Sequence, residues 1–303
     1  MKLIKQNEPM VINTVSLLIY GEAGVGKTSL AFTAENPILL DFDGGSYRSA
    51  YRKEVLQIET YKDLKDHLTE FLSILDSYNT IIIDTIGSLQ DKIKVYLIEK
   101  DPSLLNKRKS FDLWAAMLSE TMIMIDLLKG KNRDLIILGH VQEKNRGDDL
   151  IKRPVIAGQS KDQIYRFMEY IGYMSLKASQ RIIAFIPQDD SFEAKSTGGI
   201  REIIVPEAMP DDFLASKINE LKQTINSQNQ ASKLAFEEVN QSRAVIMKFE
   251  KLQEFNEFIP KLSEFAEKKI IWEILKDCAK LKGFEYDGIS KTFKDKRNHA
   301  WQF

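Results

Sequence analysis

Residues 21–28 read Gly-Glu-Ala-Gly-Val-Gly-Lys-Thr, which is a complete P-loop of the pattern GxxxxGK[ST]. The glycines of such a loop let backbone N–H groups surround a phosphate chain, and the helix that follows adds a partial positive charge. We expect Lys27 to reach the β- and γ-phosphates of ATP and Thr28 to bind Mg²⁺. The predicted nucleotide-binding residues are Gly21, Glu22, Ala23, Gly24, Val25, Gly26, Lys27, Thr28 and Ser29.

A second element of a metal site lies at residues 79–84, Asn-Thr-Ile-Ile-Ile-Asp. This is the pattern of a buried strand that ends in an acid, as a Walker B strand does, so Asp84 is expected to help hold Mg²⁺. Many P-loop ATPases place a catalytic glutamate directly after this aspartate, but the next residue here is Thr85. The carboxylate that orients the attacking water must therefore come from elsewhere.

Two further apolar runs end in residues that can do chemistry. Residues 37–45 end in Asp41, Asp43 and a glycine pair, and residues 134–140 end in His140. Alternation along a strand directs Asp41 and Asp43 to the same side, and the carboxyl ends of strands in a doubly wound sheet face the ligand crevice. We expect Asp43 to orient water and His140 to sense the γ-phosphate. The alternatives are a solvated Asp-Gly turn and a purely structural histidine.

The elements that must position these residues alternate along the chain. The P-loop joins a strand at residues 15–20 to a helix that starts at residue 29. Further strands are expected at 37–41, 80–84 and 135–139, and helices at 61–76, 86–99 and 110–129. Such alternation predicts an α/β fold with a mostly parallel sheet covered by helices on both faces. Three more β-prone runs follow, at 170–176, 181–187 and 201–205.

The pattern changes after about residue 208. We expect an ATPase core over residues 1–208, a helix and a polar linker over 209–230, and a small, mainly helical region over 231–303. A long helix at about 262–282 is expected to stop at Gly283. The pair Asp287-Gly288 then suits a two-residue hairpin turn.

Composition indicates a soluble, intracellular protein. The 303 residues carry a net charge of −1, and the single cysteine, Cys278, excludes a disulfide framework. The first nine residues lack the apolar segment of a signal peptide, and no apolar run approaches the length that spans a membrane.

The order of these motifs resembles the RecA-type ATPase core over residues 12–205. More narrowly, it resembles the phage-borne Sak-type proteins of recombination and single-strand annealing. The resemblance implies a catalytic carboxylate at Asp43, where the family usually has glutamate, and a γ-phosphate sensor at His140, where RecA has glutamine. It also implies a DNA-contacting loop after His140 and a ring or filament in the cytoplasm of a bacterial host. Lys195 matches approximately the basic residues that reach the γ-phosphate of a neighbouring subunit.

Three segments are candidates for binding single-stranded DNA, because each combines cations with aromatic residues or follows His140. The first holds Lys107, Arg108 and Lys109 with Phe111 and Trp114. The second holds Lys144, Arg146, Lys152 and Arg153, and the tail holds Lys291, Lys294, Lys296, Arg297, Phe293 and Trp301. A solvated charged surface is the alternative for each, and Trp114 can instead be a core residue of its helix.

Three classes of function fit these features. The first is an ATP-dependent protein that acts on single-stranded DNA in recombination, annealing or replication, with a single-strand-binding or replication protein as a further partner. The second is a nucleotide-gated adaptor or loader whose C-terminal helices bind a protein. The third is a small-molecule phosphotransferase with Asp41 and Asp43 near its substrate, but such kinases usually carry an arginine-rich lid, and residues 144–153 make a poor one.

Overall fold

The structure is a computed structural model that describes residues 11–130, 132–147, 149–157, 160–187 and 191–296. The described residues form two compact units, one over Ile12–Ile225 and the other built from Asn226 onward. No helix in the described ranges is long and apolar enough to cross a membrane.

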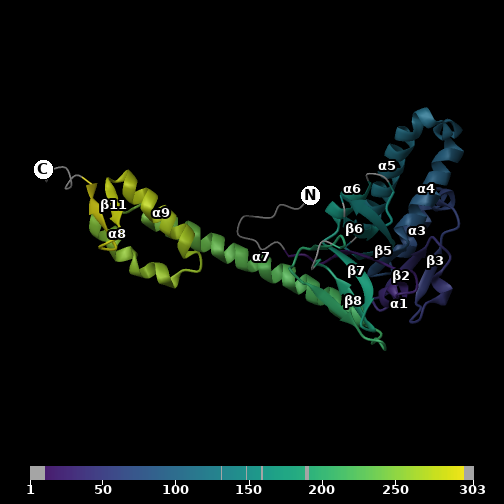
Figure 1. Ribbon diagram of the computed structural model, residues 1–303, viewed down its shortest axis with the longest axis horizontal. Helices are drawn as coiled ribbons and strands as arrows, with labels where there is room; N and C mark the ends of the chain where they lie inside the picture. Colours follow the sequence, from purple (N-terminus) through teal and green to yellow (C-terminus); the bar gives the residue numbers. More distant parts are fainter. Residues whose placement is uncertain (1–10, 131, 148, 158–159, 188–190, 297–303) are drawn as a thin grey trace. The chain divides into compact units, whose positions relative to one another are not determined.

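The first unit is built on a mixed sheet, which has ten strands within the described residues (Figure 1). The strands are β1 (Ser16–Gly21), β2 (Pro37–Asp41), β3 (Glu54–Gln57), β4 (Thr80–Asp84), β5 (Asp134–Arg146), β6 (Asp149–Pro154), β7 (Tyr170–Lys177), β8 (Gln180–Ala184), β9 (Lys195–Ser196) and β10 (Glu202–Val205). Their order is β10-β8-β7-β1-β5-β4-β2-β3, with β6 paired to β5 and β9 to β7. The run from β7 to β3 is parallel, which confirms the predicted α/β fold.

Helices cover both faces of this sheet. They are α1 (Lys27–Ala31), α2 (Tyr61–Asp66), α3 (Leu68–Leu75), α4 (Ile86–Lys100), α5 (Ser110–Lys129), α6 (Ser160–Phe167) and the first part of α7 (Phe213–Ile246). Successive residues of β4 show why two layers are needed: Ile81 and Ile83 join a core with α2 to α6, whereas Ile82 joins a core with α1 and α7. A strand that is apolar at every position can be buried only between two helical layers.

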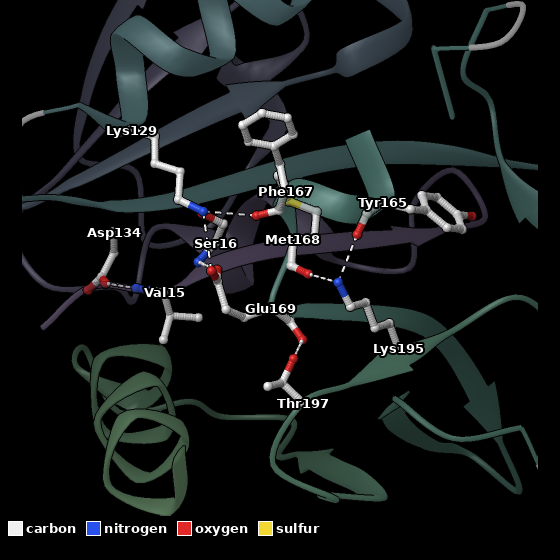
Figure 2. Close-up of polar contacts among 10 residues, drawn as sticks. All are labelled: Val15, Ser16, Lys129, Asp134, Tyr165, Phe167, Met168, Glu169, Lys195 and Thr197. Atoms are coloured by element: carbon white, nitrogen blue, oxygen red, sulfur yellow. Dashed lines mark hydrogen bonds and ion pairs between the residues drawn. The ribbon is translucent and has the colours of Figure 1, made fainter. Parts of the chain in front are cut away.

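The start of β1 is anchored by side chains from other elements. The backbone N–H of Val15 donates to Asp134 Oδ1 at 2.8 Å, and that of Ser16 donates to Glu169 Oε2 at 2.6 Å. Lys222 and Lys129 neutralise the two carboxylates, at 2.7 and 3.2 Å (Figure 2 shows the contacts of Glu169). These bonds fix the strand that leads into the P-loop.

Several boundaries differ from the prediction. The polar linker expected within residues 209–230 lies inside α7, because its Ser, Asn and Gln residues are acceptable in a helix and no glycine or proline interrupts Phe213–Ile246. The compact unit also continues past residue 208 to Ile225, since Leu214 and Ile218 pack onto the sheet. β3, β6 and α6 were not predicted.

The second unit contains the rest of α7, together with α8 (Leu252–Phe258), α9 (Lys268–Leu281) and a hairpin of β11 (Phe284–Asp287) and β12 (Thr292–Asp295). The helix α9 starts later than predicted, because a 3₁₀ turn over Pro260–Glu264 ends in extended backbone at Phe265. Gly283 follows α9 with φ +85°, the left-handed conformation expected after a helix. The hairpin loop spans residues 288–291 and is longer than the predicted two-residue turn.

Candidate functional site

The P-loop has the local structure that its sequence predicts, a loop between β1 and α1. Gly24 and Gly26 have φ values of +77° and +100°, a left-handed conformation that favours glycine. Gly21 is needed for another reason: a Cβ atom there would collide with the carbonyl oxygen of Met174 on β7. The loop is therefore shaped by backbone conformation at one end and by a close neighbouring strand at the other.

Lys27 is held inside this loop. Its Nζ donates to the carbonyl oxygens of Gly21 and Glu22, at 3.0 and 2.9 Å, and the residue is only 6% exposed. Burial lowers the pKa of the ammonium group, and the charge of Asp84 opposes this effect. Asp84 thus helps to keep a cation next to the place where the P-loop binds phosphate.

The two predicted metal-site residues are in direct contact. Thr28 Oγ1 donates to Asp84 Oδ2 at 2.7 Å, across the space between α1 and the end of β4. Burial raises the pKa of Asp84 to about 6, and the nearby carboxylates of Asp43 and Asp41 add to the effect. A buried carboxylate beside other carboxylates is stabilised by a divalent cation, and an oxygen-rich pair of ligands suits Mg²⁺.

Asp41 and Asp43 have different roles in the fold. Asp41 is buried, and its two carboxylate oxygens accept from the backbone N–H groups of Gly44 (2.8 Å) and Ser46 (3.2 Å). Burial disfavours its charge, but these hydrogen bonds, those with Ser46 foremost, outweigh burial and keep the pKa of Asp41 below its usual value. Asp43 is exposed, and its Oδ1 accepts from the N–H of Gly45 at 2.8 Å. Asp41 shapes the turn, and Asp43 projects from it.

His140 lies on β5 beside the first residue of the P-loop, since it is in register with Gly21. Partial desolvation lowers the pKa of its imidazole, the charge of Lys27 lowers it further, and Asp43 acts in the opposite direction. The residue is exposed, and a lowered pKa favours the neutral imidazole, which can donate a hydrogen bond to a phosphate oxygen or accept one from a water molecule.

A cavity of about 330 Å³ brings the predicted residues together at the carboxyl ends of β1, β2, β4 and β5. Its lining contains Ala23, Gly24, Gly26, Lys27, Thr28, Ser29, Asp43, Asp84 and His140, together with Gly45, Arg48, Ser49 and Thr85. Gly21, Glu22 and Val25 do not line it. Sequence reasoning missed Arg48, whose one signal is its position five residues after Asp43.

Lys195 lies elsewhere and already has partners in its own chain. Its Nζ donates to the backbone carbonyl oxygens of Tyr165 (2.9 Å) and Met168 (2.5 Å) at the end of α6 (Figure 2). It belongs to β9, which pairs with β7. The sequence of residues 192–199 also favours a β-hairpin with Lys195 on its second arm, and this prediction is wrong, because Phe192 pairs with Lys152 and Lys195 with β7. The role of Lys195 across a subunit boundary stays a prediction.

Of the three DNA-binding candidates, the first is the most exposed. The helices α4 and α5 form a hairpin that extends beyond the sheet (Figure 1). Its end, residues 100–114, is called the α4–α5 tip below. Phe111 is 75% exposed there and Trp114 is 43% exposed, with Lys94 Nζ 5.9 Å from the centre of the Trp114 ring. Trp114 is therefore not a core residue. Arg108 and Lys109 are exposed; for Lys107 only the backbone is described.

The second candidate is divided between surface and interior. Lys144 is exposed on β5, whereas Lys152 and Arg153 on β6 are half-buried. The ammonium group of Lys152 lies 5.5 Å from the centre of the Tyr173 ring, and Arg153 Nε is a buried atom. Only the backbone of Arg146 is described.

The tail candidate is weakened by its own fold. Phe293 is a core residue with 2% exposure, and Lys294 and Lys296 form ion pairs with Asp287 and Glu285. Lys291 lies in the hairpin loop, with φ +55°. Arg297 and Trp301 lie outside the described residues.

The strand order, the loop and the cavity together define a P-loop nucleotide-binding core. A family model described as an AAA domain matches residues 13–197, more than half of the chain. The chain therefore belongs to this AAA-domain family, whose members are P-loop ATPases. No curated protein matches the chain. The Sak-type resemblance is narrower than this family and stays a prediction.

Proposed function

We propose that this chain hydrolyses Mg²⁺-bound ATP and uses the reaction to act on single-stranded DNA in phage-type recombination, annealing or replication. One observation carries the ATPase proposal. Lys27 from the P-loop, Asp43 after β2, Asp84 at the end of β4 and His140 on β5 all line one cavity. A phosphate group bound by this P-loop would meet a cation, a metal site and a water-orienting carboxylate together.

The residues present fit a magnesium ion. Thr28 and Asp84 offer adjacent hard oxygen atoms, and burial raises the pKa of Asp84, so a cation beside it would stabilise its charged form. Among the described residues no cluster of three or more His, Cys, Asp or Glu forms a complete cation cage, so phosphate and water oxygens would complete the shell. When bound, the ion neutralises charge on the β- and γ-phosphates.

The residues of the chain divide the remaining work. Lys27 neutralises the terminal phosphates from the P-loop side, and Asp43 orients a water molecule for in-line attack. Asp43 is suited to this because one of its oxygens is fixed by the N–H of Gly45 while the residue remains exposed. His140 would couple binding of the γ-phosphate to the β5–β6 hairpin, because it lies at the point where β5 leaves the central sheet.

The α4–α5 tip supports the DNA part of the proposal. Exposed Phe111 and Trp114 can stack on bases, while Arg108 and Lys109 can neutralise the phosphate backbone. Because the chain's net charge is only −1, a ring or filament that presents several tips would strengthen binding through multivalency. In such an assembly Lys195 would have to exchange its bonds with α6 for a neighbour's γ-phosphate.

The decisive experiment measures ATP turnover with and without single-stranded DNA, beside a measurement of particle size. The proposal expects turnover that depends on Mg²⁺, rises with DNA and disappears in Lys27→Ala. Tight ATP binding with negligible turnover under all conditions would instead favour the nucleotide-gated adaptor. A phosphorylated small molecule as product would favour the phosphotransferase.

A further inference from the structure

A second cation lines the phosphate cavity. Arg48 ends a 3₁₀ turn, η1 (Ser46–Arg48), that follows β2 and the glycine pair. Its side chain contributes to the same cavity as Lys27, Asp43 and Asp84. No part of the P-loop or Walker B pattern assigns a role to this residue.

Arg48 lies next to the carboxylate that is proposed to orient water. A Cβ atom placed on Gly45 would lie 2.7 Å from Arg48 Nη2 and 2.8 Å from Asp43 Oδ1. Both groups therefore border the same small space beside Gly45. The proposed role of Asp43 places it near the γ-phosphate, and the same role would place Arg48 on that side of the cavity rather than beside the nucleobase.

The guanidinium group is free to take an anion. Arg48 Nε makes one long bond, 3.5 Å, to the carbonyl oxygen of Gly45, and its Cζ lies 5.2 Å from the centre of the Tyr47 ring. Within the described part of the chain the terminal nitrogens make no hydrogen bond, and no ion pair joins Arg48 to Asp43. Arginine binds phosphate well because its planar fork can donate two hydrogen bonds at once.

We infer that Arg48 contacts the terminal phosphate of the ATP bound by its own P-loop. This inference rests on the proposed function. Lys27 would approach this phosphate from the P-loop and Arg48 from the turn after β2, so the charge that develops during transfer is balanced from two sides. Basal hydrolysis then needs no cation from a neighbouring subunit, in keeping with the two hydrogen bonds that hold Lys195 against α6.

Arg48→Ala tests the contact through the affinities for Mg²⁺-ATP and Mg²⁺-ADP, measured side by side. Loss of a charged hydrogen bond to the γ-phosphate should weaken ATP binding by about 10- to 100-fold and leave ADP binding within about twofold. Turnover should fall by on the order of 10³-fold, and Arg48→Lys should restore part of it. Arg52→Ala is the matched control, because Arg52 is exposed nearby but does not line the cavity.

Two further variants sharpen the test. Gly45→Ala should keep the fold, since φ −95° and ψ −9° suit alanine, yet displace both Arg48 and Asp43, so turnover should fall while ADP still binds. Mixed Arg48→Ala and Lys27→Ala subunits should remain inactive, because both side chains are needed at one site.

Equal weakening of ATP and ADP, no change in either, or recovered activity on mixing would overturn the inference. If wild-type protein binds no nucleotide, or Lys27→Ala turns over normally, the proposed function itself fails. If the wild type turns over ATP and Arg48→Ala has the same turnover and nucleotide affinities, only the role assigned to Arg48 is wrong.

Discussion

Replacing Asp84 by asparagine should make the nucleotide-free protein more stable and at the same time inactive. Asp84 is 4% exposed, and burial, with the charges of Asp43 and Asp41, raises the pKa of its carboxyl group from 3.8 to about 6. Between these two values the folded chain keeps a proton that the unfolded chain has lost. The free energy of unfolding of the metal-free wild type therefore falls as pH rises through this window.

The size of the effect follows from the shift in pKa. A difference of roughly two units corresponds to about 3 kcal/mol at about pH 8, where both states are ionised, and to about 0.5 kcal/mol at about pH 4. Asparagine carries no charge and can still accept the hydrogen bond from Thr28. Asp84→Asn should thus be more stable than wild type by about 3 kcal/mol at about pH 8, with little difference at about pH 4.

Urea unfolding without magnesium or nucleotide, repeated at both pH values, measures this difference. Asp43→Asn is the matched control, because Asp43 is exposed and its removal should change stability far less. The same Asp84→Asn protein should lose Mg²⁺-dependent turnover by about 10²-fold or more. A stability gain that is the same at both pH values, or a loss at about pH 8, would refute the reasoning.

Four other changes give separate checks. Lys27→Ala should abolish ATP turnover, measured by phosphate release, because the triphosphate loses its P-loop cation. Asp43→Asn should keep ATP affinity while turnover falls strongly; unchanged turnover would make Asp43 a turn residue. Trp114→Ala should weaken single-strand binding by about 1–3 kcal/mol, with an unchanged melting temperature because the ring is exposed. Lys195→Met should lower the free energy of unfolding by about 1–3 kcal/mol, since the carbonyl groups of Tyr165 and Met168 lose their donor; an unchanged urea midpoint would contradict this.

The parts of this molecule that sequence could predict are those governed by local pattern. The P-loop needs glycines at particular backbone angles, and β4 needs apolar residues on both faces, so both leave a signal in neighbouring residues. The meeting of Asp43, Asp84 and His140 was also predictable, because parallel strands end at a common edge.

The remaining features could not be predicted, because they depend on contacts between residues far apart in the sequence or on a segment whose composition does not distinguish helix from linker. Arg48 reaches the cavity because Asp41 binds two backbone N–H groups and folds the turn back, which a reading of residue types does not reveal. In the sequence Lys195 resembles a free surface cation, because its two acceptors, the carbonyl oxygens of Tyr165 and Met168, lie about 30 residues away along the chain. The helix α7 continues through polar residues that resemble a linker. Helix propensities differ too little between residue types to distinguish a polar helix from a linker.

The length of β5 restricts which insertions and deletions this protein can tolerate between His140 and Lys144. Thirteen residues run without a break from the central sheet, past His140, into the hairpin that carries Lys144. Because side chains alternate along a strand, inserting or deleting one residue between His140 and Lys144 would turn Lys144 to the opposite face and leave the nucleotide cavity untouched. A change of two residues would preserve the face. Relatives of this chain should therefore differ in this segment by even numbers of residues, and a library of hairpin lengths should alternate between functional and defective members.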